Sequence, residues 1–292
     1  MPLFQVDPRH VRESLAMQAS HPVNADRVTS VDGLRGLLAT WVMLAHLANA
    51  SGDGHMIPMA NLCVTIFFAI SGYVLTRAWT GHFPGFLVRR FFRLWPVYAL
   101  CLAVGGYMIA RPAPLAQYFY YPFMGIHDQP AQDPVMWSLF IEAWAMLFMP
   151  LIVWIGRRPI ATGVAIAGLV AIQAYSKDLY YGAFFIGGSY CAGRVLSVKV
   201  FDTAVVQWLG RISYSLYLSH LLVIAALKFH VPGVALYVAA PACFAVAHLI
   251  WYFVERPSIW LSRRLGKKMD ALTAPIARKW RASSGFGRKA IA

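Results

Sequence analysis

Three ionisable residues share the first apolar segment of the sequence, and their spacing could build a polar site on one helix. They are Asp32, Arg35 and His46. Ionisable groups inside a membrane span are costly, so by default they indicate function. Arg35 and His46 are eleven positions apart, so a helix presents both on one face, about 16 Å apart along its axis. Asp32 precedes Arg35 by one turn, where an ion pair can form.

The same segment could instead be a simple anchor helix. Its arginine would then reach the membrane interface, and its histidine would bond to a neighbouring helix. Gly33 and Gly36 leave room for such a neighbour to approach closely. Histidine is the usual base for proton transfer near neutral pH, so His46 is the candidate base if the site is catalytic.

Two later apolar segments also carry polar groups. Glu142 lies between Ile141 and Ala143, and a lone glutamate in lipid should face the interior and be paired or protonated. It could pair with Arg35, orient His46, or only hold helices together. His220 lies one turn after Tyr217, so the two can share a polar network that either lines a site or ties helices together.

Two arginines, Arg90 and Arg93, are three positions apart at the expected start of a helix. Two guanidinium groups at this spacing suit a phosphate or pyrophosphate. The alternative is that they only anchor the chain on the positive side of the membrane. Arg89, their neighbour, is interpreted as such an anchor.

The composition predicts an all-α, polytopic transmembrane helix bundle. Hydrophobic residues make up 59% of the sequence and charged residues 13%, about half the charge of a soluble domain. About eight segments are long enough to span a membrane; they run at about 33–50, 59–79, 94–110, 135–156, 159–175, 181–198, 212–229 and 234–254. The four cysteines fall in separate apolar runs, so no disulfide and no metal site is expected.

The basic residues predict the orientation. With eight spans, 22 Lys and Arg fall on one side and three on the other, so both termini are expected in the cytoplasm. The net charge of +14 then reflects topology and attraction to anionic lipid, and it gives no reason to expect nucleic-acid binding. The expected parts are a cytoplasmic arm (1–30, with no cleavable signal peptide), a transmembrane domain (31–262) and a basic cytoplasmic tail (263–292).

Six short stretches resemble, in order, the motifs of acyltransferase family 3. The first is DGLRG (32–36) followed by His46, which reproduces the family's pattern of an arginine, ten residues and a histidine. The others are FFAISGY (67–73), RRFFRLWPVY (89–98), WSLFIE (137–142), ISYSLYLSH (212–220) and YFVERP (252–257). Members of this family are integral membrane enzymes that move acyl groups, often acetyl, onto glycans and other envelope molecules.

The resemblance implies an inner-membrane O-acyltransferase with a cytoplasmic acyl-CoA donor and a glycan or lipid-linked glycan acceptor. It implies no bound cofactor. His46 would be the general base, with Arg35, Glu142 and Asp32 in the catalytic group, and Arg90 and Arg93 would bind the donor. The residues expected to line the substrate site are Ser71, Trp137, Ser138, Tyr217 and His220.

The sequence departs from the family pattern in two ways, and an alternative function is also open. The family often has two adjacent acids where this chain has Glu142 and Ala143, and its members commonly have about ten spans. The alternative function is a transporter or flippase that uses Arg35, His46 and Glu142 as a polar relay. Transport folds often show internal repeats, and this sequence has none that we can detect.

Overall fold

The computed structural model describes residues 29–51, 59–111, 113–120, 133–194, 198–230 and 235–284. Every regular element among them is helical, which confirms the all-α prediction for this part of the chain. The expected N-terminal arm lies almost entirely outside the described residues.

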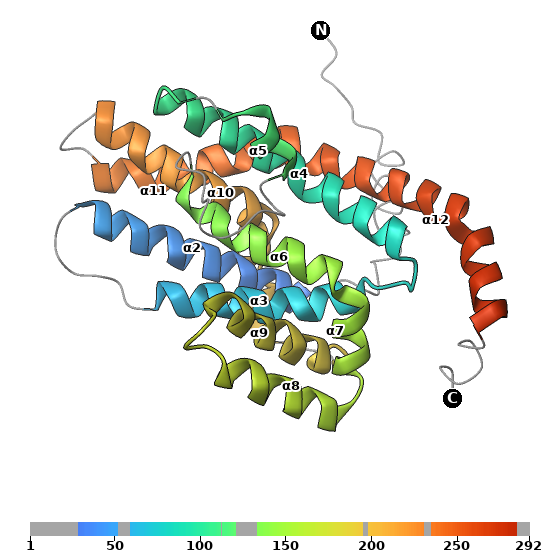
Figure 1. Ribbon diagram of the computed structural model, residues 1–292. Helices are drawn as coiled ribbons and strands as arrows, with labels where there is room; N and C mark the ends of the chain where they lie inside the picture. The colour runs from blue at the N-terminus through green and yellow to red at the C-terminus, as the bar shows by residue number, and fades with distance from the viewer. Residues whose placement is uncertain are drawn as a thin grey trace, which may run out of the picture.

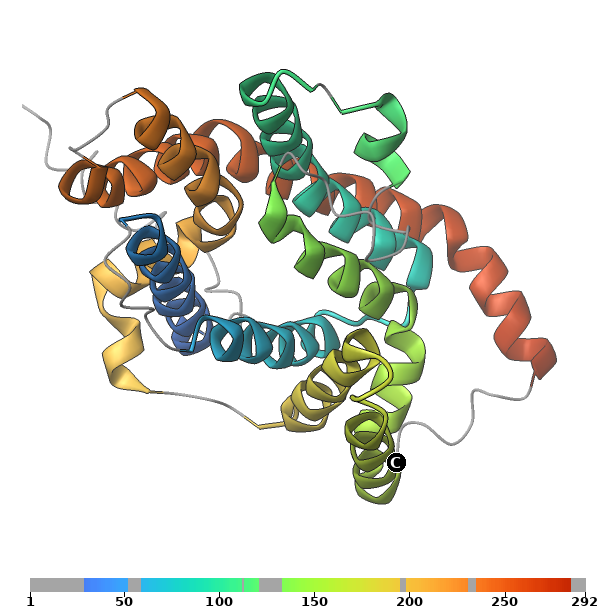
Figure 2. The same cartoon turned by 60° about the vertical axis from the view of Figure 1, so that its left-hand side comes forward.

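Four pairs of helices make the most extensive contacts and define the bundle (Figure 1). α2 (Thr29–Ser51) packs on α10 (Ala204–His230), which also packs on α11 (Ala235–Ile250). α3 (Ala60–Arg77) packs on α9 (Lys177–Cys191), with α8 (Pro159–Ala171) outermost. α4 (Phe83–Met108) packs on α12 (Arg256–Ser284). Figure 2 shows α6 (Trp137–Leu147) between α4 and α3, with the short α5 (Leu115–Tyr120) beside α4.

The predicted count of eight spans is not confirmed. By length and composition, four helical stretches in the described chain could cross a membrane: Ala60–Arg77, Phe83–Met108, Ala204–Phe229 and Val238–Pro275. The expected span 135–156 is broken, because α6 and α7 (Met149–Gly156) meet at an angle of 72°. Pro150 in the first turn of α7 explains the break, since proline has no N–H to continue the preceding helix. Counted as one span, this bent pair raises the number to five.

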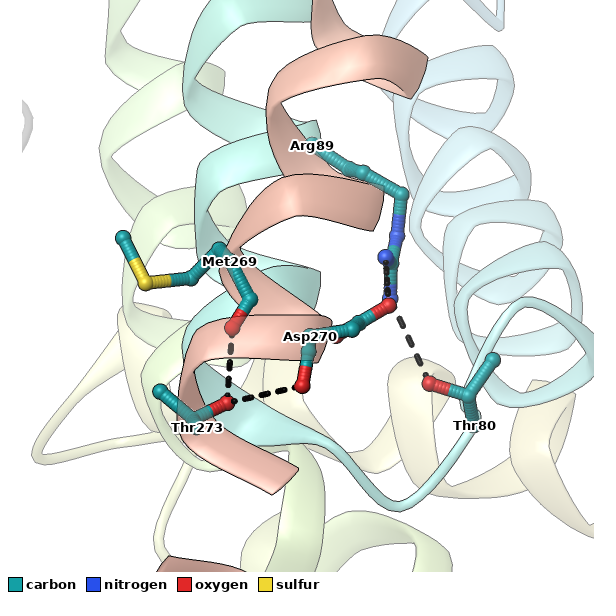
Figure 3. Close-up of polar contacts among 5 residues, drawn as sticks. All are labelled: Thr80, Arg89, Met269, Asp270 and Thr273. Atoms are coloured by element: carbon teal, nitrogen blue, oxygen red, sulfur yellow. Dashed lines mark hydrogen bonds and ion pairs between the residues drawn. The ribbon is translucent and has the colours of Figure 1, made fainter. Parts of the chain in front are cut away.

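Two basic segments outside the expected spans are helical in the structure. The basic segment before the third span belongs to α4, which begins at Phe83 with a proline in its first turn, a position that proline favours. The described part of the basic tail, as far as Ser284, is also helical, and a five-residue π-helix, Trp251–Glu255, joins α11 to α12. Arg89 of α4 forms an ion pair of 2.6 Å with Asp270 of α12 and donates a hydrogen bond to Thr80 (Figure 3). Arg89 therefore holds α12 against α4.

Small residues set the closest helix contacts. A Cβ atom on Gly36 would collide with the backbone of Leu209 and Gly210, and one on Gly33 with the carbonyl oxygen of Phe201. The predicted close neighbour of these two glycines is therefore the start of α10 and the turn before it. All four cysteines are free thiols.

Candidate functional site

The two histidines of the sequence motifs meet in the bundle. Nδ1 of His46 lies 2.8 Å from Nε2 of His220, and the two rings stack with centroids 5.0 Å apart. His220 is fully buried, and its Nδ1 lies 3.1 Å from the carbonyl oxygen of Leu216. The structure thus brings His220, predicted only as a lining residue, into direct contact with the candidate base.

This chain of hydrogen bonds fixes the proton positions on both neutral rings. The carbonyl of Leu216 can only accept, so Nδ1 of His220 must be the donor and its Nε2 the acceptor. Nδ1 of His46 then donates to His220, and Nε2 of His46 keeps its lone pair. A histidine held in one tautomer by a partner in this way is suited to act as a base.

The crossing of α2 and α10 explains why the two rings meet. The two backbones pack closely where Gly36 faces Gly210. In each helix the histidine follows ten residues later, about 15 Å along the axis. The helices run in the same direction, since Gln207 donates to the Thr29 carbonyl before the crossing and the histidines meet after it. Equal spacing from a shared crossing point therefore aligns His46 with His220.

A small polar cavity beside the histidines is lined by most of the other residues predicted for the site. Its volume is about 50 Å³. Its walls include five side chains predicted for the site: Arg35, Ser71, Ser138, Glu142 and Tyr217. They come from four helices, α2, α3, α6 and α10, so the cavity exists only in the folded bundle.

Tyr217 links this polar cavity to the histidine pair. Its hydroxyl lies 2.9 Å from the Ser138 hydroxyl and within 3.3 Å of the Val135 carbonyl. Its ring centroid is 6.1 Å from that of His220. The site therefore has two neighbouring parts, a histidine pair and a charged cavity, with Tyr217 between them.

Glu142 and Arg35 lie on walls of the same cavity. In the described part of the chain, Glu142 makes no hydrogen bond to His46, so it does not orient that ring directly. Asp32 lies one turn before Arg35, at the contact of α2 with Gly210, and is fourteen residues from His46, about 21 Å along the helix. Trp137 packs on the rings of Phe68 and Tyr181 and is not among the residues that line the cavity.

Arg90 and Arg93 face different surroundings although they are one turn apart. Arg90 is 9% exposed, its guanidinium lies over the ring of Phe86, and it lines a second, apolar cavity. Arg93 is half-buried and lies within electrostatic range of the like charge of Arg35 and the opposite charge of Glu255.

Sequence reasoning missed two buried carboxylates. By its position after the last span, Glu255 is expected to form a structural pair with Arg256 at the membrane edge. Instead it is 4% exposed and accepts a 2.6 Å hydrogen bond from Ser215 of α10, while Arg256 lies over the rings of Trp251 and Tyr252. The π-helix causes this by turning Glu255 inward, since an extra residue per turn shifts the register of the helix.

The second missed carboxylate is Asp133, which precedes α6. It is fully buried, and in the described part of the chain its Oδ2 has no hydrogen-bond partner. Burial raises the pKa of the Asp133 carboxyl to about 8. Because it is surrounded by loop sequence rich in turn residues, nothing in the sequence distinguishes it from a solvated aspartate.

Comparison with known proteins agrees with the motifs. The family model described as an acyltransferase domain matches residues 28–176, just over half of the chain. The chain is also 33% identical, over 104 residues, to a protein of Rhizobium radiobacter described as protein 2 in the picA locus. That match covers 31% of this chain and 53% of the relative, so the chain spans about half the length of the curated relative it matches. No solved structure matches.

The matched region contains Arg35, His46, Arg90, Arg93 and Glu142. His220 and Glu255 come from the part of the chain beyond it: His220 contacts His46 of α2, and Glu255 accepts a hydrogen bond from Ser215 of α10. With its ordered motifs, its helical membrane-type architecture and the family match, the chain belongs to acyltransferase family 3.

Proposed function

We propose that this protein is a multi-pass inner-membrane acyltransferase that moves an acyl group from a cytoplasmic acyl-CoA to a hydroxyl of an envelope glycan or lipid-linked glycan. The observation that carries the proposal is the hydrogen-bond chain from Leu216 through His220 to His46. It leaves a lone pair on Nε2 of a partly buried histidine, as general-base catalysis requires. Acetyl is the acyl group expected from the resemblance, and the mechanism is the same for a longer chain.

In this mechanism His46 moves the proton in both directions. Its Nε2 takes the proton of the acceptor hydroxyl as the oxygen attacks the thioester carbonyl. The imidazolium that forms is held by the lone pair of His220, which accepts the hydrogen bond from Nδ1. When the tetrahedral intermediate collapses, the C–S bond breaks and Nε2 returns the proton to the departing thiolate. An ester and free coenzyme A are the products.

The polar cavity supplies groups for the developing negative charge. The guanidinium donor of Arg35, whose residue lines the cavity, is the proposed stabiliser, since donors placed where an oxyanion forms are a large source of rate enhancement. Glu142, on the same cavity wall, offsets the charge of Arg35 when no substrate is present. These roles follow from the residue types and their common cavity.

Arg90 and Arg93 are the proposed contacts for the donor phosphates. Changing both to Gln is expected to raise the KM for the acyl-CoA at least tenfold, because each charge-assisted contact contributes about 1.5–3 kcal/mol. The kcat should change much less. The matched control is the double change of Arg157 and Arg158, two exposed arginines on the α7–α8 turn, to Gln. A KM equal to that of the control would reduce Arg90 and Arg93 to membrane anchors.

Release of the coenzyme A thiol by the purified protein tests the reaction class. The wild-type protein should cleave acyl-CoA slowly with water as acceptor, and faster when extracted envelope glycans or glycolipids are added. A transporter or flippase that uses Arg35, His46 and Glu142 as a relay should release none. Mass spectrometry of envelope glycans from cells with and without the protein would then identify the acceptor by its lost acyl mass.

A further inference from the structure

An apolar cavity lies between α4 and α6, next to the polar cavity. Its volume is about 260 Å³. Carbon surfaces dominate its walls, which include Leu94, Tyr98, Leu139, Ala143 and Met146. The polar tips of its aromatic residues bond elsewhere: the Tyr98 hydroxyl donates to the Gln117 carbonyl and the Trp95 indole N–H to the Tyr118 carbonyl. Apart from Arg90, its lining therefore offers a ligand almost no hydrogen-bonding groups.

The apolar cavity adjoins the proposed reaction site. Leu139 and Tyr214 line both the polar and the apolar cavity. The Tyr214 hydroxyl donates a hydrogen bond of 2.8 Å to the Leu94 carbonyl. This bond keeps the Tyr214 ring in the wall between the two cavities. A ligand whose polar end lies in the polar cavity can thus extend into the apolar one past these two side chains.

The lining selects among the parts of the expected substrates. A sugar, or an arm carrying amide groups, would lose its hydrogen bonds to water in this cavity without replacement, at a cost of several kcal/mol per group by the water-to-hydrocarbon scale. A hydrocarbon chain gains by entering it. The volume is also smaller than the ~300–1,000 Å³ of pockets that hold whole ligands, so it suits one part of a larger molecule.

We propose that this apolar cavity binds the hydrocarbon chain of the donor's acyl group, so that the preferred acyl group is longer than acetyl. The inference rests on the proposed function, since it needs an acyl-CoA whose thioester lies in the polar cavity. Arg90 lines the apolar cavity and is nine-tenths buried, and in the described chain no carboxylate forms an ion pair with it.

Binding of an acyl-CoA series tests the proposal. The full chain in nanodiscs would be titrated with coenzyme A and with acetyl-, butyryl-, hexanoyl- and octanoyl-CoA, and binding to empty nanodiscs of the same lipids would be subtracted. Each buried methylene should lower the Kd about fourfold, which is about 0.8 kcal/mol, giving roughly two-hundredfold between acetyl- and hexanoyl-CoA. A Kd that does not depend on chain length would overturn the proposal and would indicate that bilayer lipid fills the cavity.

Two variants test whether the acyl chain binds in the apolar cavity. Ala143→Phe places a ring inside the apolar cavity, and Met146→Trp narrows it from a half-buried position that tolerates a larger side chain. Both should remove the dependence on chain length and leave the Kd for acetyl-CoA unchanged. Ala103→Phe, on the exposed face of α4 outside the cavity, is the matched control and should bind the series as the wild type does.

The results separate this inference from the proposed function. If coenzyme A and all acyl-CoA species bind equally, the proposed donor stands and the acyl-chain site is wrong. If no species binds, the proposed donor itself is wrong. If chain length matters but Ala143→Phe and Met146→Trp behave as Ala103→Phe does, the chain binds elsewhere and the assignment of this cavity fails.

Discussion

His46→Gln is expected to abolish acyl transfer while the protein still inserts and folds. A general base contributes a factor of about 10²–10⁴ to the rate, and glutamine cannot take up a proton at neutral pH. Its amide can still donate a hydrogen bond to Nε2 of His220, so the contact of 2.8 Å has a substitute. The measurement is kcat for thiol release from acyl-CoA with acceptor present, together with the thermal unfolding midpoint of the purified variant.

Two further histidine variants are needed to interpret this result. His220→Gln should lower kcat less than His46→Gln, because His220 positions the base and does not touch the substrate. His248→Gln is the matched control: His248 also lies in an apolar helix and accepts a hydrogen bond from the indole N–H of Trp208, but it is outside the site. If His46→Gln keeps near-normal transfer, the base must be sought elsewhere, first at Glu142 or His220.

Much of the site can be predicted because its residues are unusual where they occur. A charge or an imidazole inside an apolar segment is costly, so Arg35, His46, Glu142 and His220 stand out in the amino-acid sequence alone. Helical spacing then groups Arg35 with His46 on one helix and Tyr217 with His220 on another. In the structure Arg35, Glu142 and Tyr217 line one cavity, and His46 is in direct contact with His220.

What spacing cannot give is the relation between helices far apart in sequence. His46 and His220 are separated by 174 positions, and no local pattern pairs them. Glu255 is misplaced at the membrane edge if an ordinary α-helix is assumed there, whereas the π-helix changes which side it faces. The bend between α6 and α7 escapes prediction because hydropathy over a long window does not register one proline. The errors at Glu255 and at the α6–α7 bend both come from treating an apolar segment as one uninterrupted α-helix.

The glycines at the crossing of α2 and α10 are the sequence signal that comes closest to predicting the site. Gly36 indicates room for a neighbouring helix, and the neighbour proves to be the helix that carries His220. Once Gly210 is paired with it, the ten-residue interval after each glycine aligns the two histidines. Close approach of backbones at small residues is the usual device for fixing helix contacts in membranes.

Gly36→Leu is therefore expected to disrupt both the fold and the reaction. Its side chain would meet the backbone of Leu209 and Gly210, which cannot move aside as a flexible side chain can. Overpacking of this kind costs about 1–3 kcal/mol, and a displacement of about 1 Å at the reacting groups can cost roughly 10²-fold in rate. We expect a lower thermal midpoint and, in the fraction that folds, a kcat reduced at least 10²-fold.

Substitutions of increasing size at Gly36 separate an effect on the site from gross misfolding. Gly36→Ala should show the same effects to a smaller extent, because its single methyl carbon still contacts α10. Gly163→Leu is the matched control, since Gly163 of α8 has no heavy atom within 4 Å of where its Cβ would lie and leucine favours a helix more than glycine by nearly 1 kcal/mol. It should be at least as stable as the wild type and as active. If Gly36→Leu matches this control in kcat, the crossing of α2 and α10 does not set the position of the two histidines.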